Sequence, residues 1–191
     1  MANSQRYIQL ENRIRVIETL YLPSVRPSGN YTAKEQDDIR AYLLLVHAEI
    51  ESYFEEISEK KAKEAFRKWK NTRVKSNVLL SLVSFHENKI SEPDIETRVN
   101  KALSSFIHGL RQNHGIKEAN VLAMLLPVGF EYSEIDTTWL NTITSFATSR
   151  GEIAHTAARV QQPLDPSTLK ATVQQILSEI KLIDEKLKKL R

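Results

Sequence analysis

Apolar residues that recur three and four positions apart, in a stretch without glycine or proline, constrain the fold of this chain most. This spacing brings side chains to one face of an α-helix. It is kept by Ile39, Leu43, Val46, Ile50, Tyr53 and Ile57. Thr32 and Glu35, which precede the stripe, have the spacing of a capping box, in which the two side chains satisfy free backbone N–H groups. The sequence therefore predicts a long helix from about Ala33 to Lys60 or beyond.

The same periodicity predicts further helices on both sides of the long one. Capping residues, glycine and proline set their expected limits. These limits are Ser4 to about Leu20, Asn77 to His86, Ser91 with Pro93 to Gly115, Glu118 to Leu126 before Pro127, a start at Ser133 or Asp136, and Ser167 to the C-terminus after Pro163 and Pro166. The segment 22–31 carries two prolines and a glycine and is expected to be a loop. No segment has the pattern of a strand or an internal repeat, so we expect an all-α fold.

The composition excludes several kinds of site. The 191 residues suit one globular domain, and the absence of cysteine excludes disulfides, thiolate metal sites and cysteine nucleophiles. No motif for metal binding or for a glycine-rich phosphate loop is present, so we expect no metal and no cofactor. No signal peptide or apolar run of about 20 residues is visible, which favours a cytoplasmic protein without a membrane segment. The net charge of +3 permits nucleic-acid binding without arguing for it.

Arg150 and His155 form the one pairing whose residue types point to a reaction. Cleavage of RNA without a metal needs a base for the 2′-hydroxyl, positive charge at the phosphate and an acid for the leaving oxygen. Histidine titrates near neutral pH, and arginine presents a planar fork that matches phosphate oxygens. On a continuous helix the five-residue offset is about 140°, so the pair shares a face only if Gly151 bends the backbone or the arginine stem reaches round. Glu152, three residues before His155, is placed to orient the imidazole.

Spacing alone also fits a surface arginine and a histidine that packs against another helix. The wider sequence decides between the readings, because "LNTITSFATSRGEIAH" at 140–155 resembles the end of a HEPN domain. HEPN domains form a helical superfamily of ribonucleases and nucleotide-binding proteins that is defined by Arg, four to six residues, and His. Segments 41–57, "AYLLLVHAEIESYFEEI", and 113–130, "NHGIKEANVLAMLLPVGF", resemble the RiboL-PSP-type branch.

The resemblance covers roughly residues 33–160 and implies an antiparallel helical bundle. We expect a single domain over 1–191, with a core at about 33–160 and added helices at 5–20 and 167–190. In the family, Arg150 and His155 would be the catalytic pair, and two protomers would pack in parallel so that both motifs line one cleft. Cleavage would yield a 2′,3′-cyclic phosphate and a 5′-hydroxyl. Glu51 matches a glutamate of this branch and would face the motif.

The resemblance also implies partners: RNA, a second copy of the chain, and an antitoxin or defence-system protein. Family members of this kind occur in toxin–antitoxin and phage-defence systems. This chain departs from the family at Gly151, because the residue after the arginine is often Asn or another polar residue. A catalytically silent HEPN domain that dimerises and binds RNA or a protein is therefore the second hypothesis. A helical adaptor that pairs through its C-terminal helix is the third.

Basic residues outside the motif are candidate RNA contacts. Eight of the sixteen residues from Lys60 to Lys75 are Lys or Arg. We name as candidates Arg67, Lys68, Lys70 and Arg73, with Trp69 stacking on a base. A solvated helix face is the alternative reading of this run. Arg159 lies on the predicted face of His155 and would add a phosphate contact.

The remaining candidates each have a structural alternative. Glu51 also fits a carboxylate at the flank of the helix, paired with a neighbouring base. His47, four residues earlier, is expected to be a packed or boundary histidine. His108 and His114 are six residues apart and do not align as helical metal ligands.

Overall fold

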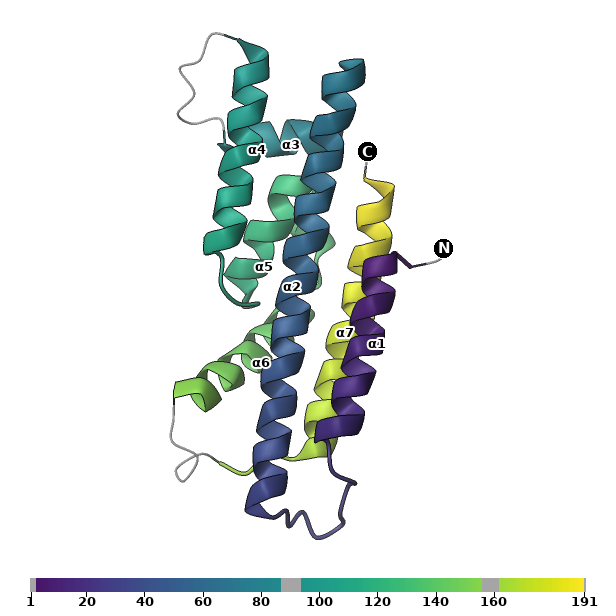
Figure 1. Ribbon diagram of the computed structural model, residues 1–191, viewed down its shortest axis with the longest axis vertical. Helices are drawn as coiled ribbons and strands as arrows, with labels where there is room; N and C mark the ends of the chain where they lie inside the picture. The colour runs from purple at the N-terminus through teal and green to yellow at the C-terminus, as the bar shows by residue number, and fades with distance from the viewer. Residues whose placement is uncertain (1–2, 87–93, 156–161, 191) are drawn as a thin grey trace.

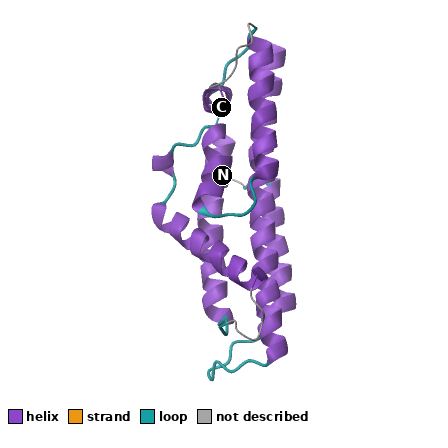
Figure 2. Cartoon of the chain, turned by 90° about the vertical axis from the view of Figure 1, so that its left-hand side faces the viewer, coloured by secondary structure: helices purple, strands orange, loops and turns teal. Residues whose placement is uncertain are grey.

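The computed structural model describes residues 3–86, 94–155 and 162–190, and every element in those ranges is helical. Figure 2 shows these helices and the loops that join them. The α-helices are α1 (Gln5–Tyr21), α2 (Ala33–Thr72), α3 (Asn77–His86), α4 (Ile95–Gln112), α5 (Glu118–Leu125), α6 (Thr137–His155) and α7 (Pro166–Lys189). Two 3-10 helices follow α5: η2 (Leu126–Val128) and η3 (Tyr132–Glu134). The prediction of an all-α fold is confirmed.

α2 is the axis of the molecule. Its 40 residues span about 60 Å at 1.5 Å per residue. α1 and α7 lie beside it along one side, α3, α4 and α5 pack toward its C-terminal half, and α6 crosses it obliquely (Figure 1). The predicted apolar stripe from Ile39 to Ile57 is buried along its whole length, as expected. Burial of this stripe beneath several helices is the main source of stability that the fold gives to α2.

Local capping explains where most helices begin. The predicted capping box is present: the Glu35 N–H donates to Thr32 Oγ1 at 3.2 Å, and the Thr32 N–H donates to Glu35 Oε2 at 2.8 Å. Ser4 caps α1, since its hydroxyl accepts from the Tyr7 N–H at 3.1 Å. Of the two expected starts for α6, Asp136 is correct, because its carboxylate accepts from the Trp139 N–H at 2.7 Å.

Four predicted helix limits are wrong. α4 ends at Gln112 with Asn113 as its C-cap, and not at Gly115. α4 is capped by Asp94, which accepts from the Thr97 N–H at 2.8 Å; Ser91 and Pro93 lie outside the described residues. α7 is capped by Asp165, and Pro166 takes the first helical position, where its missing N–H costs nothing. Ser167 is therefore inside the helix. Pro127 does not follow α5 directly but lies within η2, which continues from it.

A buried carboxylate joins α1, α2 and α7. Asp184 is fully buried on α7 and accepts hydrogen bonds from the Ser4 N–H at 2.7 Å, the Ser4 hydroxyl at 2.5 Å and the Tyr53 hydroxyl at 3.0 Å. A second polar contact lies at the other end of α7. There the Gln36 amide of α2 accepts from the Leu164 N–H at 2.9 Å and donates to the Leu164 carbonyl at 3.0 Å. These contacts fix both ends of α7 against the long helix.

No helix in the described ranges has the length and apolar character needed to cross a bilayer. This finding agrees with the sequence, in which no long uncharged apolar run was identified.

Candidate functional site

A cavity of about 330 Å³ lies where α2, the α4–α5 loop, α5 and α6 meet. Most of its walls are polar or small side chains. The lining residues are His47 and Glu51 of α2, His114, Gly115, Ile116 and Lys117 of the loop, Asn120 of α5, and Ala147, Arg150 and Gly151 of α6. Arg150 and Glu51, which were both named from the sequence, therefore line the same cavity although they are 99 residues apart.

Glu51 holds the α4–α5 loop by its backbone. One carboxylate oxygen, Oε1, accepts a short hydrogen bond from the N–H of Gly115. Gly115 has a φ of +109°, a backbone conformation that side-chain-bearing residues rarely adopt, so glycine is required there. Asn113 and Asn120 close the loop on its other side. The Asn120 side-chain amide donates to Asn113 Oδ1 at 2.8 Å and to the His114 carbonyl at 3.3 Å, and the Asn113 amide donates to the Asn120 carbonyl at 3.1 Å. Glu51 thus ties the α4–α5 loop to α2.

His47 lies one helical turn before Glu51 and is only 3% exposed. Its Nδ1 is 3.6 Å from Glu51 Oε2, too long for a hydrogen bond, and no described group bonds to it. Burial lowers the pKa of His47; the Glu51 carboxylate opposes this effect, and the Arg150 guanidinium adds to it. The imidazole is therefore held neutral near neutral pH. The burial of His47 agrees with the prediction of a packed histidine. The prediction did not include a ring nitrogen, Nδ1, that lacks a hydrogen-bond partner among the described residues.

Arg150 reaches the cavity from the last turns of α6. This helix is anchored below it by buried residues of the core, among them Phe146 and Ala147, and Thr144 accepts a hydrogen bond from the Glu118 N–H at the start of α5. The Arg150 guanidinium forms no hydrogen bond or ion pair with any described residue. An arginine that lines a polar cavity without a carboxylate partner keeps its donors available for an anion.

The other half of the motif is at the end of the same helix. His155 is the last residue of α6, and its side chain lies outside the described residues, as does the whole of Arg159. α6 stays helical through Gly151, so the glycine does not interrupt the helix between the two motif residues. In this geometry the five-residue offset turns the pair about 140° apart within one chain. Glu152 is exposed and does not line the cavity.

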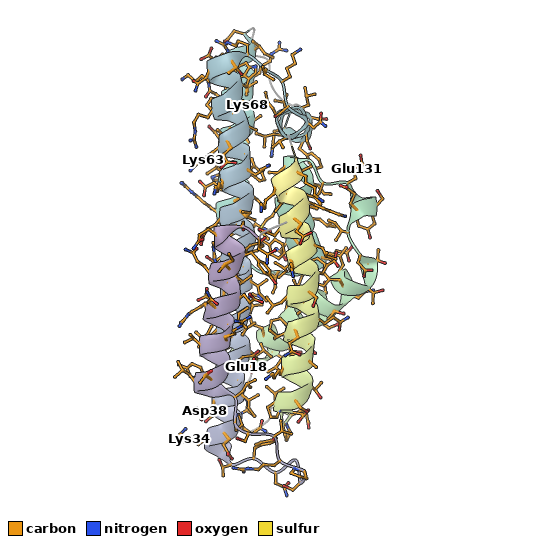
Figure 3. The ribbon with its side chains drawn as sticks, turned by 90° about the vertical axis from the view of Figure 1, so that its right-hand side faces the viewer. Glu18, Lys34, Asp38, Lys63, Lys68 and Glu131 are labelled. Atoms are coloured by element: carbon orange, nitrogen blue, oxygen red, sulfur yellow. The ribbon has the colours of Figure 1, made fainter. Side chains whose placement is uncertain are left out.

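The basic candidates of α2 lie away from this cavity. Arg67 is sixteen residues after Glu51, which places it about 24 Å along the helix and about 160° around it. It lines a different groove of about 470 Å³ with Arg6 of α1 and Lys60 and Lys63 of α2. Lys63 and Lys68 lie on the part of α2 that extends beyond the start of α1 (Figure 3). Lys68 and Lys70 are exposed there.

Trp69 and Arg73 do not present the surface that the sequence led us to expect. Trp69 is 4% exposed, and the Arg73 guanidinium lies 4.8 Å from the centre of its ring. Base stacking on Trp69 is therefore wrong for this structure, because its ring is already covered. Arg73 is also paired with Glu96 of α4 at 2.9 Å. All four candidates of the run are exposed, but among the described residues only Arg73 is engaged, by the Trp69 ring and by Glu96.

Four residues that line the cavity were not expected there from the sequence: His47, His114, Lys117 and Asn120. His114 and Asn120 lay within the quoted "NHGI" segment, and His47 lies one turn before Glu51. A signal was thus present in the sequence: a histidine and a glutamate four apart on one helix face. The contact with the loop arises only from tertiary packing, since Glu51 and Gly115 are 64 residues apart.

Neither the search of curated proteins nor the search of solved structures found a match to this chain. A family model does match, under the description RiboL-PSP-HEPN, over residues 8–189. The match extends from α1 to the end of α7 and includes the whole cavity around Arg150. With nearly all of its length matched, the chain belongs to the RiboL-PSP-HEPN family.

Proposed function

We propose that this HEPN domain is a metal-independent endoribonuclease in which Arg150 and His155 form the catalytic pair. One observation carries the proposal: the Arg150 guanidinium lines a polar cavity without a hydrogen-bond or ion-pair partner among the described residues, five residues before the histidine that ends the same helix. A partnerless arginine is suited to an anionic ligand, and a nearby histidine supplies a group that can exchange a proton at neutral pH.

The proposed reaction is an internal displacement at phosphorus. The ribose 2′-oxygen forms a bond to the adjacent phosphorus while the bond from phosphorus to the 5′-oxygen breaks. A histidine takes the 2′-hydroxyl proton, and an acid donates a proton to the leaving 5′-oxygen. Arg150 binds the phosphate oxygens and stabilises the extra negative charge of the transition state. The products are a 2′,3′-cyclic phosphate and a 5′-hydroxyl, and no other reactant is consumed.

A homodimer supplies both proton-transfer groups. One histidine cannot be base and acid in the same step, and the helical offset separates Arg150 from His155 of its own chain by about 140°. Two protomers packed in parallel bring two such pairs to one cleft, so the base and the acid come from different chains. Glu152 is placed beside His155 on the helix, where it would orient the imidazole. Arg159, Arg67, Lys68 and Lys70 are the remaining proposed RNA contacts, and Arg73 is left out because Trp69 and Glu96 already engage it.

Cleavage of total RNA in EDTA tests the proposal. We expect the wild-type protein to cleave and the Arg150→Ala and His155→Ala variants to lose at least about a hundredfold in rate. Matched controls are Arg111→Ala and His108→Ala, which remove exposed side chains of α4 outside the cavity. Equal cleavage by the motif variants and their controls, or activity only with added metal, would contradict it.

A silent, RNA-binding HEPN domain is the second candidate, and Gly151 is the observation that favours it. The glycine lines the cavity where the family often has a polar residue. A Cβ at this position would meet no atom within 4 Å, so packing does not require glycine. A Gly151→Asn variant that cleaves RNA when the wild type does not would establish this reading. Growth inhibition on expression, relieved by Arg150→Ala, would instead support a toxin or defence effector held in check by a partner protein.

A further inference from the structure

Three basic side chains outside the Arg–His motif line the cavity beside Arg150, and two of them come from the α4–α5 loop. We propose that Arg150, Lys117, His114 and His47 form a ribonucleotide-phosphate subsite within a single protomer, and that Glu51 positions the loop that builds it. The proposal rests on the proposed function only in taking RNA as the ligand. It does not require that the chain cleave RNA.

The charges in the cavity favour an anion. Arg150 and Lys117 are the arginine and the lysine among the lining residues, and Glu51 is the carboxylate among them. That carboxylate is engaged by the Gly115 N–H, which leaves it less available as a partner for either cation. Glu55 lies one turn further along α2. Burial and then the Glu51 charge raise its pKa, and the interaction with His114 opposes this effect. The phosphate of a nucleotide would balance the positive charge of Arg150 and Lys117, and arginine binds phosphate through two parallel hydrogen bonds.

His47 provides independent evidence that a ligand belongs here. It is almost wholly buried, lines the cavity, and has a ring nitrogen without a hydrogen-bond partner among the described residues. A buried polar atom is costly to leave unpaired, and such atoms usually bond to protein, ordered water or a ligand. A ribose hydroxyl next to the bound phosphate has the right chemistry to satisfy it. The cavity volume of about 330 Å³ is large enough for a sugar and its phosphate.

Glu51 is a positioning residue because it acts through the loop. Its hydrogen bond to the Gly115 N–H ties α2 to the segment that carries His114 and Lys117. The Asn113–Asn120 pair closes this segment, so removing the Glu51 contact shifts the loop as a unit. Glutamine has the same length and keeps an oxygen that can accept from Gly115. Glu51→Gln should therefore keep the subsite, and Glu51→Ala should lose it.

Binding of a labelled single-stranded oligoribonucleotide tests the subsite separately from cleavage. The full-length protein carries His155→Ala, and fluorescence anisotropy is measured in EDTA over a series of salt concentrations. We expect Lys117→Ala to weaken binding about tenfold and to reduce the slope of log affinity against log salt by about 0.7, the value of one lost phosphate contact on a single strand. The matched control is Lys34→Ala at the far end of α2 (Figure 3), for which affinity and slope should not change.

The other variants locate the effect on the loop. His114→Ala should weaken binding several-fold and His108→Ala should not, although both histidines are exposed. Glu51→Ala should match Lys117→Ala, with recovery in Glu51→Gln. A Lys117→Ala variant that binds with the affinity and salt slope of the control overturns the inference even if the protein cleaves RNA. The expected binding pattern in a protein that never cleaves supports the subsite and removes the nuclease proposal alone.

Discussion

Replacement of Asp184 by alanine should destabilise the fold by about 3–5 kcal/mol. The carboxylate is fully buried and accepts three hydrogen bonds, two from Ser4 and one from Tyr53. Hydrogen bonds to a charged group contribute about 1.5–3 kcal/mol each. Two terms reduce the sum: the variant no longer buries a charge, and the half-buried Ser4 donors regain water. The Tyr53 hydroxyl lies in the core and cannot bond to water, so it would lose its hydrogen-bond partner.

Thermal and denaturant unfolding measure this effect. For a domain of this size about 2–4 °C is lost per kcal/mol, so we expect the melting temperature to fall by about 10 °C. Glu185→Ala, which removes the neighbouring and less buried carboxylate, should change stability by less than about 0.5 kcal/mol. A small loss in Asp184→Ala, equal to that of the control, would refute the reasoning that this carboxylate joins α1, α2 and α7.

Three further predictions concern the rest of the fold. Gln36→Met should cost about 1–3 kcal/mol in denaturant unfolding, because it removes both hydrogen bonds to Leu164; a neutral result would contradict the contact. Gly151→Ala should raise stability by about 0.5–1 kcal/mol, since the position is helical and open, and a fall in melting temperature would argue against a continuous α6. Burial raises the pKa of Tyr7 to about 12 and that of Tyr53 still further, whereas both titrate near 10 when unfolded. Stability should therefore be intact below pH 10 and fall between pH 10 and 12, and unfolding free energies that are equal at pH 8 and pH 11.5 would exclude this linkage.

The sequence predicted the long helix well because its signals are local. A capping box and a stripe of apolar residues act within a few turns, and both appear in the structure where they were expected. The starts of α4 and α7 were harder, since several capping residues stand close together in the sequence. Pro166 determines where α7 begins. Its fixed backbone angle suits the first helical position, and Asp165 is therefore the N-cap.

The candidate site could be predicted only in part, because it joins distant segments. Arg150 and Glu51 were recognised through a family resemblance, and the structure places both on one cavity. His114 and Lys117 line the same cavity from the loop that Glu51 contacts at Gly115, and no local pattern encodes this contact. For the basic run of α2, the sequence shows the charged residues but not where they lie relative to the cavity. The helix turns Arg67 away from the cavity.

Analysis of the products of a defined oligoribonucleotide in EDTA is the decisive test of Arg150 as a catalytic residue of a metal-independent ribonuclease. Mass spectrometry of the fragments reports both cleavage and the chemistry of the new ends. We expect fragments that end in a 2′,3′-cyclic phosphate, paired with fragments that begin with a 5′-hydroxyl, from the wild type and not from Arg150→Ala. Intact oligonucleotide with the wild type, or fragments that carry a 5′-phosphate, would contradict it.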